Sequence, residues 1–271
     1  MGRLRFTVLG CGSSGGVPRI GPAGPNWGAC DPDDARNRRT RCALLVERIG
    51  EAGTTSVLLD AGADIRQQLI EARAGMLDAL ILTHDHADHV HGLDDLRMVA
   101  FNRRARLPAW MDARTEAVMM HRFAYVFEQQ PGSGYPAIMD RHVFDPEAGP
   151  ITLEGPGGVI EAHGFPVVHG DIIALGFRIG PLAYVPDISA MTEAAWSAIA
   201  GADCWVLDAL RYTPHPSHAN VETALAWIAE AGVPRAYLTN LHVDLDYATL
   251  DRETPEHVRP AQDGLVLEYP I

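Results

Sequence analysis

The chain has 271 residues, of which 47% are hydrophobic, and its formal net charge is −13 at pH 7. The hydrophobic fraction supports a substantial core and excludes a disordered chain. The negative charge argues against a long nucleic acid as the partner, although a locally basic site can still receive a small phosphorylated ligand.

No apolar stretch reaches the roughly 20 residues that a membrane-spanning helix needs, so no membrane association is expected. The first residues, MGRLRFTVLGCGSSGG, contain too short an apolar run for a secretory signal peptide. None of the four cysteines belongs to a C-x-x-C pair, and we expect free thiols in a reducing, cytoplasmic location. Both a monomer and a homodimer are compatible with the sequence.

Short aliphatic and β-branched runs alternate with glycine-containing turns through the first third of the chain. Strands are predicted at 4–10, 41–48, 55–62 and 77–83. Residues 63–74 have helical character, and residues 92–101 are also predicted to be helical. A further helix is predicted over 114–127, where apolar residues recur at helical spacing.

The segment 128–142 interrupts this pattern with the sequence QQPGSGYPAIMD and is predicted to be an insertion or a lid. The later strands are predicted at 142–145, 151–155, 158–169, 173–180, 182–187, 204–212 and 236–242, with helices at 192–200 and 221–231. The same order of several strands followed by strand–helix units therefore occurs twice. Two sheets in face contact with helices outside are the economical architecture. No linker-like segment separates the halves, so we expect one domain over 1–271.

Residues 83–91 read THDHADHVH and contain an H-x-H-x-D-H cluster. The cluster consists of His84, His86, Asp88 and His89. Packing does not require so many imidazoles and carboxylates in one turn, and these donors suit Zn²⁺, Mn²⁺ or Fe better than a soft copper site. If the first two histidines hold one ion, the Asp-His pair can hold a second, about 3.5–4 Å away, in a hydrolytic centre. Asp85 is expected to face solvent or a neighbouring loop.

A cluster on adjacent residues cannot enclose two ions, so further ligands must come from later in the chain. Three polar donors each follow an apolar strand: His169 ends FPVVH, Asp187 ends LAYVPD and His242 ends AYLTNLH. A lone histidine is more often a structural or surface residue than a ligand. Three donors in the same context, where loops carry function on a rigid scaffold, favour ligand roles.

With these residues in order, the chain resembles the metallo-β-lactamase fold superfamily. The superfamily pattern is H-x-H-x-D-H, followed by a histidine, an aspartate and a final histidine that each end a strand. The resemblance implies an α/β fold, a four-layer αββα sandwich, with a dinuclear site at one edge. The matching residues are His84, His86 and His169 for one ion, Asp88, His89 and His242 for the other, and Asp187 as the bridge beside a shared water.

Within the superfamily the chain looks closest to PhnP-like phosphodiesterases of the phosphoribosyl cyclic phosphate type, and more distantly similar to tRNA 3′-processing endonucleases. The motifs that carry this resemblance are GCGSSGGVP, WGACDP and HPSHANVETAL. His218 falls where these phosphodiesterases have a histidine near the scissile phosphate. Asp60 would orient a ligand histidine, and Asp208 is a similar candidate. Some members carry a cysteine-rich structural zinc site, whereas this chain offers only Cys30 in that stretch.

The resemblance therefore implies a metal-dependent phosphoric diester hydrolase. Its expected substrate is a small cyclic phosphate or nucleotide-type phosphodiester, cleaved through a metal-bridging hydroxide. The expected cofactors are two divalent transition metal ions, Zn or Mn, with Fe as a further option. Asp88 and His218 are the expected catalytic residues, and His218 would bind the phosphate or protonate the leaving alkoxide. A histidine at a helix N-terminus is the structural alternative for His218.

Two alternative activities would use the same metals. One is hydrolysis of another ester class, such as a thioester or a lactam, and the other is a tRNA-processing type of endonuclease. The late HPSH segment favours a phosphodiester substrate. A non-catalytic binding protein on the same scaffold is disfavoured, because such relatives usually lose ligands and this chain retains all seven.

Overall fold

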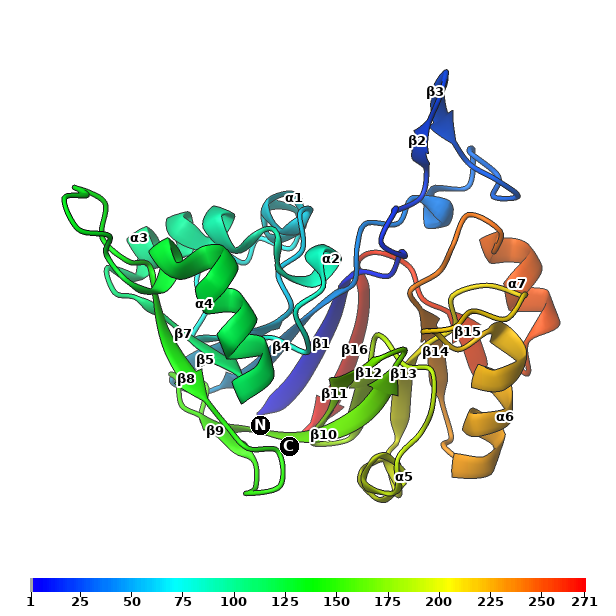
Figure 1. The fold of residues 1–271 in the computed structure, drawn as a ribbon. Helices are drawn as coiled ribbons and strands as arrows, with labels where there is room; N and C mark the ends of the chain where they lie inside the picture. The colour runs from blue at the N-terminus through cyan, green and yellow to red at the C-terminus, as the bar shows by residue number, and fades with distance from the viewer. Residues whose placement is uncertain (1) are drawn as a thin grey trace. The chain divides into compact units, whose positions relative to one another are not determined.

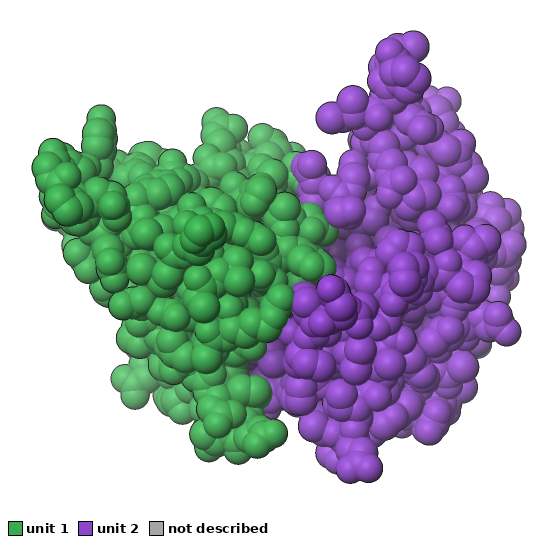
Figure 2. All heavy atoms as spheres, viewed as in Figure 1, with its two compact units in different colours: residues 1–9, 43–161, 266–271 green, residues 10–42, 162–265 purple. Residues whose placement is uncertain are grey.

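The computed structural model describes residues 2–271 and divides into two compact units, coloured separately in Figure 2. Unit 1 consists of Met1–Leu9, Ala43–Glu161 and Val266–Ile271. Unit 2 consists of Gly10–Cys42 and Ala162–Leu265. Each unit is therefore built from segments that are far apart in the sequence, and the chain passes between the units more than once.

Unit 1 contains a mixed sheet of seven strands (Figure 1). In spatial order its strands are β16 (Leu265–Pro270), β1 (Arg3–Gly10), β4 (Ala43–Gly50), β5 (Gly53–Leu59), β6 (Ala79–Ile81), β7 (Leu107–Met111) and β8 (Met139–Val143). β4 and β5 are antiparallel, whereas β5 to β8 run parallel to one another. The parallel strands need crossover connections. These contain α1 (Ile65–Glu71), α2 (Ala87–Val90), the 3₁₀ helix η2 (Leu93–Leu96), α3 (Arg97–Arg103) and α4 (Ala113–Phe127).

A second mixed sheet, also of seven strands, repeats this scheme. Its order is β15 (Val258–Pro260), β14 (Ala236–Thr239), β13 (Cys204–Asp208), β12 (Leu182–Val185), β11 (Ile172–Ile179), β10 (Ile160–His169) and β9 (Ile151–Leu153). The pairs from β10 to β12 are antiparallel, and β12 to β15 are parallel. The crossovers contain α5 (Glu193–Ile199), α6 (Val221–Ala231) and α7 (Tyr247–Glu253). Unit 2 also has a hairpin of β2 (Arg19–Gly21) and β3 (Gly24–Asn26), followed by the 3₁₀ helix η1 (Ala35–Asn37).

The central parallel strands have apolar side chains on both faces, as expected for strands covered on both sides. All residues of β6, and Trp205 and Leu207 of β13, are buried. Each unit has its own hydrophobic core, with Leu45 and Leu80 in unit 1 and Val185 and Leu207 in unit 2. Packing of these cores holds the ends of the parallel strands in place, and polar side chains extend from those ends.

Most predicted elements are present, with shifted ends. The helix predicted over 221–231 is α6, and Asn220 caps it by accepting a hydrogen bond from the Thr223 amide at 3.0 Å. The strand predicted at 142–145 is wrong in position, because the observed strand β8 spans Met139–Val143. It pairs with β7. Residues 128–138 of the predicted insertion contain no helix or strand, whereas 139–142 belong to β8.

Eight elements were not predicted: β2, β3, η1, α2, β7, α7, β15 and β16. β7 contains Pro108, a residue that argues against a central strand because it cannot donate to the ladder. Here tertiary pairing with β6 and β8 outweighs that local preference. Within residues 2–271, none of the helices combines the length and apolarity that crossing a membrane requires.

Candidate metal centre

The H-x-H-x-D-H cluster lies in unit 1, directly after the carboxyl end of β6. His84 belongs to the loop after the strand, His86 precedes α2, and Asp88 and His89 lie in the first turn of α2. The ring centroid of His84 is 4.6 Å from that of His86 and 4.3 Å from that of His89. The short helix therefore gathers three imidazoles and one carboxylate on one strand end.

Asp60, at the end of β5, holds this loop in place. Its Oδ2 is 2.7 Å from His89 Nδ1, and its Oδ1 accepts a hydrogen bond from the Thr83 amide at 2.8 Å. The Thr83 hydroxyl in turn lies 3.0 Å from His84 Nδ1. Asp60 is fully buried and adopts a left-handed φ of 65°, which is uncommon for a residue with a side chain. Both rings are thus held through Nδ1, which leaves Nε2 as the atom that can face a metal.

Asp88 and Asp85 have different environments although both lie in the cluster. Asp88 Oδ2 lies 3.6 Å from His89 Nε2, so these two donors face each other. The expectation that Asp85 faces solvent or a loop is wrong: it is 4% exposed and pairs at 3.1 Å with Arg114 of α4. Arg122, also from α4, donates to the Asp85 carbonyl oxygen at 2.7 Å. Asp85 therefore attaches the loop to a helix.

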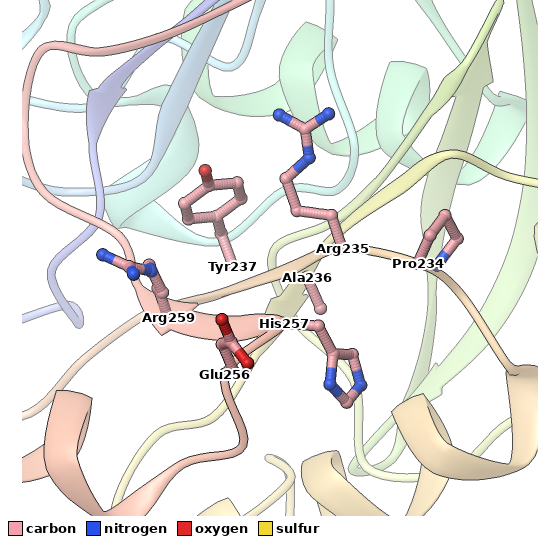
Figure 3. Close-up of a pocket in the computed structure, with 7 residues that line it drawn as sticks. All are labelled: Pro234, Arg235, Ala236, Tyr237, Glu256, His257 and Arg259. Carbon is pink, nitrogen blue, oxygen red and sulfur yellow. The ribbon is translucent and has the colours of Figure 1, made fainter.

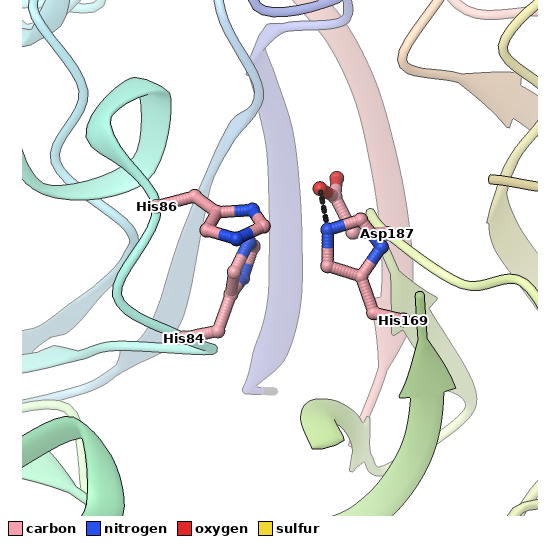
Figure 4. Close-up of side chains that lie close together, drawn as sticks. All are labelled: His84, His86, His169 and Asp187. Atoms are coloured by element: carbon pink, nitrogen blue, oxygen red, sulfur yellow. Dashed lines mark ion pairs between the residues drawn. The ribbon is translucent and has the colours of Figure 1, made fainter. Parts of the chain in front are cut away.

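His169 and Asp187 lie together in unit 2. His169 is the last residue of β10 and Asp187 follows β12, and His169 Nε2 is 3.3 Å from Asp187 Oδ2. Figure 4 shows this pair, along with His84 and His86 of unit 1. His169 Nδ1 lies 2.6 Å from the Ser217 carbonyl oxygen, its hydrogen-bond acceptor. As in His84 and His89 of unit 1, Nδ1 of His169 is held by a hydrogen-bond partner, and Nε2 faces the neighbouring ligand candidate.

Asn240 was not singled out from the sequence, yet it contacts two predicted site residues. Its Nδ2 donates to Asp187 Oδ1 at 3.1 Å and lies 3.1 Å from His218 Nδ1. It is 2% exposed and, with a φ of 60°, adopts a left-handed conformation. The only sequence signal is an amide just beyond the apolar strand β14, which by itself resembles an ordinary turn residue.

His218 is paired with a buried carboxylate. Its Nδ1 is 2.8 Å from Asp208 Oδ2, and its ring centroid is 4.7 Å from that of His169. Burial raises the pKa of the Asp208 carboxyl to about 7, and the neighbouring His218 opposes that shift. A histidine that only precedes a helix does not need such a contact with a buried carboxyl group.

His242 lies in the turn that follows β14. Its main-chain amide donates to the Leu210 carbonyl at 3.0 Å, and its Nδ1 is 3.0 Å from Asp244 Oδ2. Burial lowers the pKa of the His242 imidazole, and Arg19 adds to that effect. A neutral imidazole is the form that binds metals. Unit 2 thus brings His169, Asp187 and His218 into mutual proximity, whereas His242 pairs with Asp244.

These side chains fit a divalent metal ion by their chemistry. The imidazoles and carboxylate drawn in Figure 4 are donors of the kind that hold Zn²⁺, Mn²⁺ or Fe. The four cysteines, by contrast, are buried and form no disulfide bond, and Cys30 contacts main-chain carbonyl oxygens. The candidate centre is therefore composed of histidine and aspartate, as the sequence predicts.

A separate open pocket of about 430 Å³ lies at the opposite, amino-terminal end of β14 and β15 (Figure 3). Its polar lining residues are Arg235, Tyr237, Glu256, His257 and Arg259. None of them is a predicted ligand. Ligands of open α/β sheets bind outside the carboxyl ends of the strands, so this pocket is distinct from the candidate centre.

Comparison with known proteins identifies the family of the chain. A family model described as a Beta-lactamase superfamily domain matches residues 55–240. A PhnP-family diphosphatase of known crystal structure is 32% identical, with a TM-score of 0.85 over 99% of this chain and 98% of that one. Zn²⁺-bound PqqB from Methylobacterium extorquens has the same fold, with a TM-score of 0.72 at 22% identity over 97% and 99% of the two chains.

Another relative is named for a different activity. The octanoyltransferase of Porphyromonas gingivalis is 31% identical over 97% of this chain but only 51% of its own length. The chain thus spans about half the length of that relative.

Two mixed sheets with helices, carrying histidine and aspartate at strand ends, define a metal-dependent hydrolase of the metallo-β-lactamase fold. Because the family model covers more than half of the sequence, the chain belongs to the Beta-lactamase superfamily. The predicted αββα sandwich class and the predicted hydrolase class are confirmed at this level.

Proposed function

We propose that the chain is a dinuclear phosphodiesterase that hydrolyses a small cyclic phosphate or a nucleotide-type phosphodiester. In this proposal the ligands predicted from the sequence hold two divalent transition metal ions. The proposed ligands are His84, His86, Asp88, His89, His169, Asp187 and His242. Zinc and manganese are the proposed metals, and the proposed partner is a small phosphorylated substrate.

The anchoring of the rings supports these ligand roles. Asp60 contacts His89 Nδ1, Thr83 contacts His84 Nδ1, and the Ser217 carbonyl contacts His169 Nδ1. Metal-binding histidines usually have such a partner on the other ring nitrogen, because it fixes the tautomer and the ring direction. A histidine with only a structural role can be held through either ring nitrogen. The repeated contact at Nδ1 therefore supports metal binding through Nε2.

The charge of the site suits an anionic substrate. When bound, two divalent ions supply Lewis acidity and a water of lowered pKa. Asp88 and Asp187 are the only carboxylates among the seven proposed ligands, so they offset half of the four positive charges of two divalent ions. A phosphodiester, which carries one negative charge, therefore enters a positively charged site in an otherwise acidic protein.

His218 is the observation that carries the phosphodiesterase assignment. Its ring lies beside that of His169, and the buried Asp208 carboxylate contacts its Nδ1. Asp208 also accepts a hydrogen bond from the Ile188 amide at 3.0 Å, which fixes the carboxylate itself. In this proposal His218 Nε2 donates a proton to the leaving alkoxide, which is the step that ester cleavage requires beyond the metals, and the contact of Nδ1 with Asp208 supports that role. Similarity to a PhnP-family diphosphatase supports a phosphoryl substrate.

The test is turnover of a panel of cyclic phosphates, chromogenic phosphodiesters and thioesters by metal-loaded protein. We expect phosphodiester turnover, removed by chelation and restored by added Zn²⁺ or Mn²⁺. His218→Ala should lower kcat by roughly 10²–10⁴-fold, the usual contribution of a general acid. The loss should be smallest for esters with acidic leaving groups, which need little protonation. Preferential turnover of thioesters, or an unaffected His218→Ala variant, would contradict the proposal.

A further inference from the structure

A buried arginine in unit 2 has no role in the proposed chemistry. Arg39 is 2% exposed. Its Nη2 donates to Asn37 Oδ1 at 3.0 Å, and its Nη1 donates to the His242 carbonyl oxygen at 3.4 Å. Neither acceptor is charged, and within residues 2–271 its Nε has no hydrogen-bond partner. Burial of a charged group with neutral acceptors costs stability, so these contacts are not explained by stability alone.

Asn37 extends the contact of Arg39 to the start of α7. It is fully buried, its Nδ2 donates to Asp246 Oδ2 at 2.8 Å, and its Oδ1 accepts a hydrogen bond from the Tyr247 amide at 2.8 Å. Asp246 is the N-cap of α7. Arg39 and Asn37 thus hold both ends of the turn between His242 and the helix.

Cys30 holds the middle of the same turn. Its Sγ lies 3.3 Å from the Val243 carbonyl oxygen and 3.4 Å from that of Leu245, and it is 3.9 Å from Arg39 Nη1. Gly28, with a φ of 57°, allows this close approach: a Cβ there would lie 2.5 Å from the Val243 carbonyl oxygen. Residues 242–246 have no helix or strand of their own, so the segment 10–42 determines their path.

We propose that Arg39 is a positioning residue for His242. The His242 amide is bound to the Leu210 carbonyl, and its carbonyl oxygen is bound by Arg39 and by the Leu245 amide at 3.1 Å. With the peptide groups on both sides of its Cα held, the direction of the Cα–Cβ bond is fixed and only side-chain rotation remains. The inference rests on the proposed function, because His242 needs a fixed direction only as a metal ligand.

The first test measures Zn²⁺ binding to the Arg39→Met and His242→Ala variants by calorimetric titration. Both substitutions should weaken the same one of two binding events, Arg39→Met by roughly 10- to 100-fold, the range found when partners of metal ligands are removed. The other event should keep its wild-type affinity. Arg38→Met is the matched control, because Arg38 is the exposed neighbour that packs over the Trp27 ring. Wild-type affinity for both ions in Arg39→Met would overturn the inference.

The second test needs no metal or activity. Hydrogen exchange in the metal-free protein should be faster at the His242 and Leu245 amides in Arg39→Met, with the amides of β13 unchanged. If Arg39→Met does not fold, Arg39→Lys takes its place, since a lysine keeps the charge but lacks the planar fork. Unchanged exchange in a folded variant would also overturn the inference. If His242→Ala retains both binding events, the proposed function fails instead, and exchange still decides whether Arg39 holds the turn.

Discussion

Asp60 and Asn240 show how single residues in an unusual backbone conformation organise this site. Each follows a buried strand, each has a φ near +60°, and each directs a polar side chain at a predicted ligand. Left-handed residues other than glycine cost conformational energy and persist where surrounding contacts over-determine them. Their position beside His89 and Asp187 indicates that the strain serves the geometry of those two side chains.

Replacing Asp60 tests this at the residue scale. In Asp60→Asn the hydrogen bonds from Thr83 can persist, but the amide no longer offers a charged acceptor to His89 Nδ1. We expect the affinity for one metal ion to fall by roughly 10- to 100-fold, measured by titration calorimetry. Asp94→Asn is the control, because Asp94 is an exposed residue of η2 that pairs with Arg97, the first residue of α3. Equal metal affinities in both variants would contradict the orienting role of Asp60.

At the element scale, both sheets place an antiparallel pair before three parallel steps: β4–β5 continues to β8, and β11–β12 continues to β15. Asp60 follows β5 and Asp187 follows β12 at corresponding points. This repetition explains why the site could be predicted from apolar runs that end in polar donors, since carboxyl ends of parallel strands lie at one sheet edge.

Other features could not be predicted, for physical reasons. The role of Asn240 depends on its φ value, which the sequence pattern does not encode. The pairing of Asp85 with Arg114 depends on how α4 packs against the loop after β6, which is a tertiary contact. Asp208 and His218 were predicted only as two separate candidates, because they are ten positions apart in the sequence and the pattern does not show that they are in contact.

The turn between β10 and β11 provides a prediction for an element. Gly170 has a φ of 60°, and a Cβ at this position would lie 2.8 Å from Ser217 Cβ. Gly170→Ala should therefore displace Ser217, whose carbonyl holds His169, and lower the free energy of unfolding by about 2–4 kcal/mol through strain and crowding. Thermal or urea unfolding measures this loss.

Gly201→Ala separates crowding from backbone strain. Gly201 has a φ of 71°, but nothing lies within 4 Å of a Cβ there. This control should lose only about 1–2 kcal/mol, the cost of a left-handed residue with a side chain. It should also keep wild-type metal affinity, whereas Gly170→Ala should not. Equal losses of stability and affinity in the two variants would show that the contact with Ser217 is unimportant.

At the scale of the whole molecule, a partly buried carboxyl group makes stability depend on pH. Asp263 accepts hydrogen bonds from the Cys11 amide at 3.0 Å and from the Thr40 amide at 2.7 Å. Burial nevertheless raises the pKa of the Asp263 carboxyl to about 6, because these hydrogen bonds only partly compensate the lost hydration. The folded protein therefore binds this proton more tightly than the unfolded chain does.

The sign of the effect follows from that difference. Below pH 4 the Asp263 carboxyl is protonated in both the folded and the unfolded protein, and its contribution to stability is fully present. That contribution is lost as the pH rises through about 6, where the folded protein also releases the proton. We expect Asp263 to reduce the free energy of unfolding by about 3 kcal/mol across this range. Asp263→Asn should remove this component of the slope in urea unfolding measured from pH 4 to pH 7. An unchanged slope would show that the carboxyl titrates normally.

The discontinuous make-up of unit 1 has a consequence for biosynthesis. β16 is the sheet neighbour of β1, although nearly all of the other strands and helices lie between them in the sequence. While the ribosome is still making β16, β1 lacks that neighbour and presents an unpaired edge to other chains. Nascent protein is thus exposed to misassociation until β16 has been made, and a chaperone that shields this edge would act during that interval.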